Sequence, residues 1–196
     1  MHAKPNGQND YEKAFEEWLR EQGVRFARVD QTHRCRFGGG AVKTFDYLIY
    51  PHQGACVLVE LKGRIFRGRS LAGRTGLQTW VFADDVVALA DWRRRFERQF
   101  SRAAAVIVFA YRIEQIAADC DGLDSYETND RRYVFLAIRQ QDYQACMRRR
   151  SVRWKTVSCP AADFRTLSFP FEQMWLGEDN TNEFDDTNIG RTSPGR

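Results

Sequence analysis

Three charged residues lie in a stretch of chain that otherwise has the composition of buried strands. Asp46 lies in the run "FDYLIY" (45–50), and Glu60 and Lys62 lie two residues apart in the run "ACVLVELK" (55–62). Burying an unpaired charge costs several kcal/mol or more, so such residues must pair with one another, bind a metal, or lie at a strand end. The three residues are therefore candidates for a chemical site.

The alternation of side chains along a strand predicts how these residues meet. Glu60 and Lys62 fall on the same face, about 7 Å apart, and the apolar residues of their run take the other face. If the segments 42–50 and 55–62 form a hairpin through the turn at 51–54, Asp46 comes close to both charges. The pattern predicts two carboxylates and one amine on one face of a sheet.

This set of groups suits the hydrolysis of a phosphodiester. Two carboxylates, Asp46 and Glu60, together with a backbone carbonyl such as that of Leu61, supply oxygen ligands for Mg²⁺ or Mn²⁺. Such a metal lowers the pKa of a bound water and neutralises charge on a phosphate oxygen. Lys62 can position or deprotonate the attacking water, and burial helps to lower its pKa for that task. The alternative is a structural ion-pair cluster without chemistry.

The first element that must position this set is a helix over residues 10–23. Its apolar residues recur at helical spacing on one face: Tyr11, Ala14, Phe15, Trp18 and Leu19. Asp10 can cap its start and Gly23 can end it. Glu12 lies roughly 20° from Leu19 around the helix axis, whereas Glu16 and Glu17 point further out. Glu12 is thus the helix acid expected to face the interior, with a surface position as the alternative.

The remaining periodicities complete an α/β pattern. Three strands, over 24–30, 42–50 and 55–62, are spaced as an antiparallel meander. A helix over 84–100, a strand over 103–111 buried on both faces, a strand over 131–139 and a short helix over 141–150 follow. The order α-β-β-β-α-β predicts a single α/β domain over 10–176, with a central mixed sheet flanked by helices. Residues 1–9 and 177–196 are expected to be a flexible N-terminus and a disordered tail.

Charge is unevenly distributed along the chain. The net charge is +4, and the segment 177–196 holds five acids and two arginines, so the preceding 176 residues carry +7. The basic excess lies in the segments 63–76, 92–100 and 147–155, which can attract a polyanion; a solvated surface is the alternative. The glycine-rich segment 63–76 is expected to form a flexible loop whose arginines grip phosphates: Arg64, Arg67, Arg69 and Arg74.

Cysteine usage and hydropathy bound the setting of the protein. The five cysteines are scattered without a CxxC pair, which argues against a disulfide framework and a zinc site. No apolar run approaches the roughly 20 residues of a membrane span, and the N-terminus lacks the apolar region of a signal peptide. We therefore expect a cytoplasmic protein with no membrane partner.

Glu12, Asp46 and the triplet "ELK" at 60–62, on elements in this order, resemble the PD-(D/E)xK nuclease superfamily, which includes type II restriction enzymes and archaeal Holliday-junction resolvases. The resemblance covers residues 10–111, with Phe45 where many members have proline. It implies a restriction endonuclease-like core in which Asp46 and Glu60 bind the metal and Lys62 is the catalytic lysine. Glu12 would then act through the metal's waters. Gln78 resembles a glutamine that follows the third strand in some members; an ordinary polar loop residue is the alternative.

The opening segment "DYEKAFE" (10–16) also resembles a family named for an HYExAFE motif, with Asp10 in place of the histidine. The resemblance to nucleases implies an Mg²⁺- or Mn²⁺-dependent endonuclease that acts on nucleic acid, with DNA as the expected partner, and it leaves a homodimer open. Two other interpretations remain: a nucleic-acid-binding protein that keeps the fold without turnover, and a globular protein whose charged residues only neutralise one another.

Overall fold

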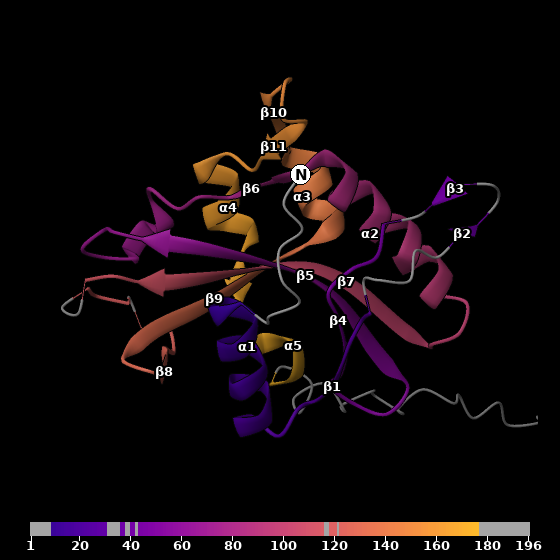
Figure 1. Ribbon diagram of the computed structural model, residues 1–196, viewed down its shortest axis with the longest axis horizontal. Helices are drawn as coiled ribbons and strands as arrows, with labels where there is room; N and C mark the ends of the chain where they lie inside the picture. The colour runs from indigo at the N-terminus through magenta and orange to yellow at the C-terminus, as the bar shows by residue number, and fades with distance from the viewer. Residues whose placement is uncertain are drawn as a thin grey trace, which may run out of the picture.

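A long strand, β5 (Ala55–Phe66), runs through the centre of a seven-stranded mixed sheet in the computed structural model (Figure 1). The structure describes residues 9–30, 36–37, 40–41, 43–115, 118–120 and 122–176. The sheet is flanked by helices on both faces, which confirms the predicted α/β class and the single domain with a central mixed sheet. The predictions for residues 1–8 and for the tail 177–196 lie outside the described ranges.

The sheet has the strand order β1-β4-β5-β7-β9-β12, with β8 paired to β9. The strands β1, β4 and β5 form the expected antiparallel meander, and β5 pairs in parallel with β7 over its whole length. The bounds of the other strands in this sheet are β1 (Arg25–Arg28), β4 (Tyr47–Tyr50), β7 (Arg102–Ile113), β8 (Tyr126–Thr128), β9 (Arg131–Arg139) and β12 (Phe169–Pro170).

A smaller sheet of three strands lies beside the main one, in the order β10-β11-β6. Its strands are β6 (Trp80–Phe82), β10 (Arg148–Ser151) and β11 (Thr156–Ser158), and a separate two-stranded ribbon joins β2 (Arg36–Phe37) to β3 (Gly40–Ala41). The helices are α1 (Asp10–Glu21), α2 (Ala83–Phe96), α3 (Gln140–Cys146), α4 (Ala161–Leu167) and α5 (Gln173–Leu176), with a 3-10 turn η1 (Ala72–Arg74).

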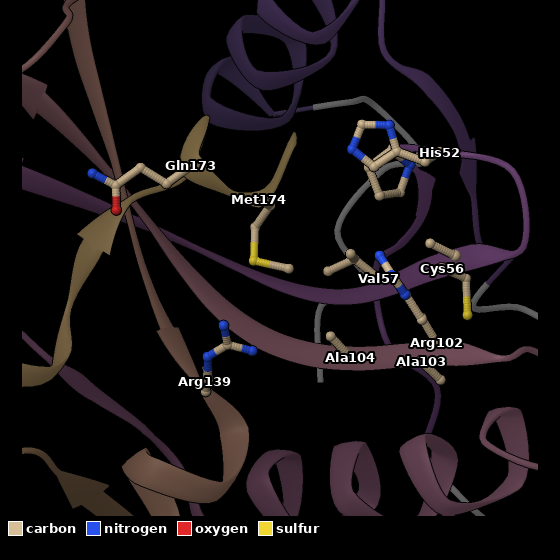
Figure 2. Close-up of a pocket in the computed structure, with 11 residues that line it drawn as sticks. His52, Cys56, Val57, Arg102, Ala103, Ala104, Arg139, Gln173 and Met174 are labelled. Atoms are coloured by element: carbon tan, nitrogen blue, oxygen red, sulfur yellow. The ribbon is translucent and has the colours of Figure 1, made fainter. Parts of the chain in front are cut away.

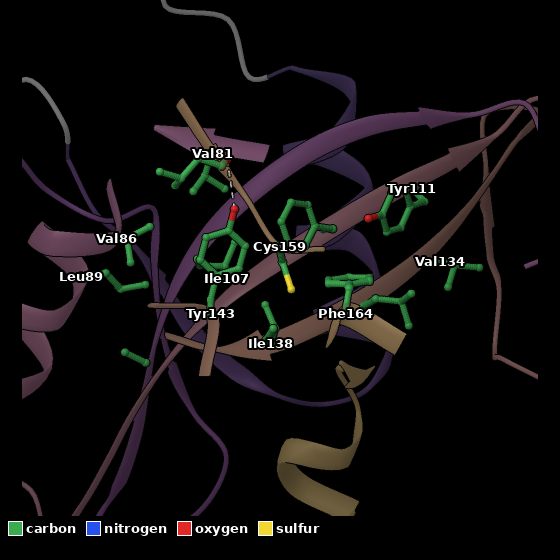
Figure 3. Packing of buried hydrophobic residues seen from close by; sticks show 14 of the residues in the cluster. Val81, Val86, Leu89, Ile107, Tyr111, Val134, Ile138, Tyr143, Cys159 and Phe164 are labelled. Atoms are coloured by element: carbon green, nitrogen blue, oxygen red, sulfur yellow. Dashed lines mark hydrogen bonds between the residues drawn. The ribbon is translucent and has the colours of Figure 1, made fainter. Parts of the chain in front are cut away.

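Two hydrophobic clusters hold the layers together, one on each face of the sheet. The helices α2, α3 and α4 contribute Leu89, Tyr143 and Phe164 to the first cluster, part of which Figure 3 shows. The helix α1 packs Phe15 and Trp18 into the second cluster, on the opposite face. Because β7 is covered on both faces, its apolar run is buried from Ala105 to Tyr111, whereas Ala103 and Ala104 at its start are partly exposed.

Several predicted boundaries were wrong. The strand expected over 42–50 begins only at Tyr47, β5 continues through Phe66 into the stretch expected to be a loop, and the helix expected over 141–150 ends at Cys146 before β10. The residue that caps α1 is Asn9, whose side chain accepts hydrogen bonds from two backbone N–H groups, and Asp10 is the first helical residue. Gly23 follows the helix with a φ of 67°, as a helix-ending glycine should. Within the described ranges, no helix has the length and apolar character needed to cross a membrane.

The start of α1 is set by a close approach to β5. A Cβ atom on Gly63 would lie 2.5 Å from the ring of Tyr11, well inside contact distance. The same ring packs edge-on against Tyr133 in β9, with centroids 6.0 Å apart. Glycine at position 63 therefore lets the first turn of α1 lie directly on the sheet, and Glu12 follows Tyr11 in that turn.

We predict that Gly63→Ala destabilises the protein by about 1 to 3 kcal/mol, because the methyl group forces Tyr11 out of its place. Chemical denaturation of the single variant, of Tyr11→Ala and of the double variant measures the effect. In the Tyr11→Ala background the cost of Gly63→Ala should disappear, since the atoms that clash are gone. Equal costs in both backgrounds would contradict this explanation of the glycine.

Candidate active site where β4 leaves β5

The candidate site lies at the point where β4 stops pairing with β5. The register pairs Tyr47 with Val59 and ends there, one residue after Asp46 and one residue before Glu60. Asp46 is in a bend before β4, and its carboxylate accepts a hydrogen bond of 2.7 Å from the N–H of Leu61. The side chain of Asp46 thus replaces the backbone partner that β4 no longer offers to β5.

Asp46 also joins three strands through its backbone. Its N–H donates to the carbonyl of Val59 and its carbonyl accepts from the N–H of Val29, which follows β1. Within a strand the N–H and C=O of one residue point to the same side. Because the N–H of Leu61 points to Asp46, the Leu61 carbonyl points to the same space beyond the end of β4.

Lys62 is held between two carboxylates. Its ammonium donates to Glu60 over 2.6 Å and to Asp85, near the start of α2, over 2.7 Å. The second oxygen of Asp85 is paired with Lys43. Lys43 remains half exposed, whereas the Asp85 side chain is fully buried and that of Lys62 is 17% exposed. The structure brings together Asp46, Glu60 and Lys62, and it adds Asp85, which was not among the predicted site residues.

Burial is the main influence on the pKa values of these acids. Burial and then the charge of Asp46 raise the pKa of Glu60 to about 8, against the opposing attraction of Lys62. Burial also raises the pKa of Asp46, despite the hydrogen bond from Leu61. Burial would raise the pKa of Asp85 as well, but Lys62 and Lys43 outweigh burial and lower it. In the metal-free protein, the raised pKa values of Glu60 and Asp46 favour a proton on this pair.

The expected lowering of the Lys62 pKa was wrong. Burial lowers the pKa of Lys62, but the attraction of Glu60 and Asp85 outweighs burial, so that its pKa is raised. The residue is therefore an ammonium ion at neutral pH. Such a group can position a water or stabilise negative charge, and it is a poor proton acceptor.

The first-helix acids are placed differently from the prediction. Glu12 is only half-buried, and its carboxylate is bonded to Asn9 and Arg28, whereas Glu16 is buried and accepts a hydrogen bond from the Tyr47 hydroxyl. The helix α1 covers the face of the sheet opposite to α2. Glu12 therefore approaches Asp46 around the sheet end, close enough for its charge to contribute to the raised pKa of Asp46.

The other predicted site residues lie outside this cluster. Gln78 is exposed in the segment before β6, and its backbone carbonyl accepts a hydrogen bond from Tyr111. Arg67 and Arg69 are exposed beyond the end of β5, and Arg67 pairs with Glu114.

Arg64 and Arg74 serve the protein's own structure. The Arg64 side chain is buried, donates to the carbonyls of Gly63 and Trp80, and stacks 4.0 Å from the Trp80 ring centroid. Arg74 bonds to Ser168 between β12 and α4. The expectation that all four arginines grip phosphates from a flexible loop is thus corrected for these two, because β5 extends through position 64 and η1 fixes position 74.

A separate basic hollow of about 410 Å³ lies at the other end of β5 (Figure 2). Arg102, Arg139 and His52 are among its lining residues, together with Met174 from α5. The hollow lies at the first residues of β5 and β7 and the last residue of β9, whereas Glu60 and Lys62 lie further along β5 and on the face covered by α2. The hollow is therefore distinct from the cluster around Lys62.

The cluster has donors that fit a hard divalent cation. Among the described residues, no three His, Cys, Asp or Glu side chains gather so as to hold a metal ion by themselves. Mg²⁺, however, is usually bound by one or two carboxylates and keeps several waters. Asp46, Glu60 and the Leu61 carbonyl are oxygen donors of the kind that such a site uses.

Comparisons with known proteins leave the family open. No protein-family model matches the chain, and no curated protein matches it.

The raised pKa of Glu60 predicts a pH-dependent stability in metal-free solution. The unfolded acid has a pKa near 4.3, so between about pH 4.3 and 8 the folded protein keeps a proton that the unfolded chain releases. The free energy of unfolding therefore falls as pH rises through this window, by at most about 1.4 kcal/mol per pH unit for this group. Denaturation of the wild type and of Glu60→Gln from pH 5 to pH 9, with a chelator present, measures the slope.

Glu60→Gln should have a smaller slope and should be the more stable of the two proteins at pH 9, because it carries no charge to bury. Asp91→Asn, on the same helix as Asp85 but in a half-exposed pair with Arg94, is the matched control and should follow the wild type. A Glu60→Gln protein that is strongly destabilised at pH 9 would instead make Glu60 a required ion-pair partner of Lys62.

Proposed function

We propose that this protein is a metal-dependent nuclease that hydrolyses phosphodiester bonds, with DNA as its substrate. The observation that carries the proposal is the buried cluster at the end of β4. It contains three carboxylates, Asp46, Glu60 and Asp85, gathered around the ammonium of Lys62. This is the set of groups that the resemblance to PD-(D/E)xK nucleases implies, with Asp85 added.

The residues that would hold Mg²⁺ or Mn²⁺ are Asp46 and Glu60, with the carbonyl of Leu61. When bound, the metal would lower the pKa of a water and neutralise charge on a phosphate oxygen. Asp46 is fixed for this role by its bond to the Leu61 N–H, so its carboxylate cannot swing away from β5. Glu12 lies at the edge of the same space, where its bond to Arg28 holds it.

Lys62 would position the attacking water and stabilise the charge that develops on the phosphate. An ammonium has three donors, and among the described residues two of them go to Glu60 and Asp85. The third donor is left for a water or a phosphate oxygen. Because its two partners hold the ammonium rigidly in a nearly buried position, its interaction with developing charge is stronger than it would be in water.

The rival interpretations differ from this one in what they require of Lys62. A protein that only binds nucleic acid needs its surface cations, and a structural cluster needs only that the buried charges be paired. Neither explains why Asp46 and Glu60 are buried although burial raises their pKa values and so makes their charged forms costly. That cost supports a site that receives a cation.

We predict that the purified protein nicks or cuts DNA with Mg²⁺ or Mn²⁺ and that a chelator abolishes this activity. Lys62→Ala should reduce the rate constant for cleavage by about 10² to 10³, as loss of a fixed electrostatic donor does. Its metal binding, measured by calorimetric titration, should remain. Asp46→Asn should lose both DNA cleavage and metal binding, since it removes a charged ligand of the metal.

The control is again Asp91→Asn, which should cleave as the wild type does. The melting temperature of metal-free Asp46→Asn should be preserved or raised, because the change relieves repulsion between carboxylates. The proposal fails if no duplex, branched or single-stranded substrate is cleaved with either metal. If salt-sensitive binding to DNA then persists, a non-catalytic binding protein is the better interpretation.

We predict that Asp85→Asn slows cleavage by changing Lys62 rather than by losing metal. One of the two carboxylates that raise the pKa of Lys62 is then neutral, so the pKa of the ammonium falls. The alkaline limb of the pH–rate profile should move to lower pH relative to the wild type, and metal affinity should change little. An unchanged profile with a uniformly lower rate would mean that Asp85 only supports the fold.

A further inference from the structure

The hairpin formed by β10 and β11 is a strongly basic surface. Its residues 148–158 include four arginines and one lysine but no acid, and all five cations are exposed. In the part of the chain that the structure describes, none of the five forms an ion pair. Their charge is therefore available to a polyanion.

Large apolar side chains are exposed between these cations. Trp154 in the hairpin turn is 63% exposed, and Phe82 at the end of β6 is 43% exposed. Both belong to the wall of a hollow of about 380 Å³, which is completed by Lys43, Asp84, Arg153 and Lys155. Exposed aromatic rings next to cations suit a nucleic-acid base with its phosphates, since every base has a face that can stack.

A second pairing of cations with an aromatic ring extends the surface along β6. The guanidinium of Arg150 lies 5.2 Å from the centroid of the Trp80 ring, which the buried Arg64 also contacts. The register between β10 and β11 shifts between Arg149 and Ser151, and this bulge re-aims Arg150. The basic and aromatic residues thus continue toward the strand that carries Lys62.

The hollow is joined directly to the candidate site. Its Lys43 pairs with the oxygen of Asp85 that Lys62 does not use, so one carboxylate separates a wall of the hollow from Lys62. The backbone holds the hairpin in the same place, because the N–H of Ala83, two residues before Asp85, donates to the carbonyl of Lys155 over 2.9 Å. A nucleotide in the hollow would be a close neighbour of a phosphate at Lys62.

We propose that this hollow binds an unpaired nucleotide, so that the substrate of the site is a single-stranded segment of nucleic acid. The base stacks on Trp154 and Phe82, and the flanking phosphates lie on Arg153 and Lys155. The carboxylate of Asp84 favours the base over a phosphate inside the hollow, because it repels anions and accepts hydrogen bonds from base N–H groups. Bases in a duplex are stacked on one another and cannot enter. The claim that the bound strand is cleaved rests on the proposed nuclease function, whereas the claim that the hollow binds a nucleotide does not.

Binding of the full-length protein to labelled oligonucleotides in the presence of a chelator tests the hollow without cleavage. Single-stranded DNA, single-stranded RNA, duplex DNA and a duplex with a single-stranded flap are compared. Trp154→Ala should weaken binding of the single-stranded substrates roughly ten- to hundredfold, which corresponds to the loss of one stacked base. Trp154→Phe should retain most of the affinity, and duplex affinity should change little.

The salt dependence of the binding affinity separates the contribution of charge from that of base stacking. Arg153→Ala should reduce the slope of log affinity against log salt by about 0.7 for a single strand, whereas Trp154→Ala should leave this slope unchanged. Leu176→Ala, at an exposed apolar residue of α5, and Arg98→Ala, at an exposed arginine beyond the end of α2, are the matched controls. Neither should alter the preference for single strands.

The outcomes are distinct from those of the cleavage experiment. Wild-type affinity in Trp154→Ala, or a preference for duplex that this variant does not change, overturns the hollow even if the protein cleaves DNA. Failure to bind any oligonucleotide also overturns it. Trp154-dependent binding without metal-dependent cleavage supports the hollow and rejects the nuclease. The DNA and RNA arms decide which single strand is preferred.

Discussion

The burial of charged groups around Lys62 is the constraint on which the candidate site depends. Glu60 and Asp85 hold its ammonium, and Asp46 is close enough to Glu60 for its charge to raise the Glu60 pKa. In a medium of low polarity, a buried carboxyl group is stabilised by a proton or by a cation. In the absence of metal, the raised pKa of Glu60 favours the proton. Apolar residues would fill the same space at lower cost, so a buried set of acids is more readily explained by a ligand than by stability.

The geometry of the sheet creates the room for this set. The strand β5 pairs with β7 along all of its length, but with β4 only through Val57, Leu58 and Val59. Beyond that point no strand in the described part of the chain pairs with β5 on the β4 side, and the Asp46 side chain accepts a hydrogen bond from the Leu61 N–H instead. A backbone edge, two carboxylates and an ammonium therefore meet where the two strands part. Pairing with β7 keeps β5 rigid there, so the site is built on a strand and not on a loop.

Simple periodicity predicted much of the cluster. The two-residue repeat of a strand placed Glu60 and Lys62 on one face, and the short turn at 51–54 predicted that Asp46 comes close to both. Asp85 was not predicted as a site residue, although its position in the helix indicates burial. It precedes Ala88, Leu89 and Trp92 at helical spacing, on the buried face of α2. The burial of Glu16 instead of Glu12 could not be predicted from the angular position of each residue around the helix axis. That angle gives the direction in which a side chain points. It does not give the position of the helix on the sheet, which depends on the contact between Tyr11 and Gly63.

The segment from Trp80 to Asp85 connects the site to the basic hairpin. It supplies Trp80 and Phe82 to the aromatic surface through β6, and three residues after Phe82 it supplies Asp85 to Lys62. A cluster of acids repels a polyanion. If the proposed nuclease function is correct, cations near the cluster are needed to offset this repulsion when no metal is bound. The hairpin carries those cations, at the top of Figure 1, and its bond to Ala83 fixes them relative to the acids. One short segment therefore joins the acidic cluster to the basic hairpin, through the bond of Ala83 to Lys155 on one side and that of Asp85 to Lys62 on the other.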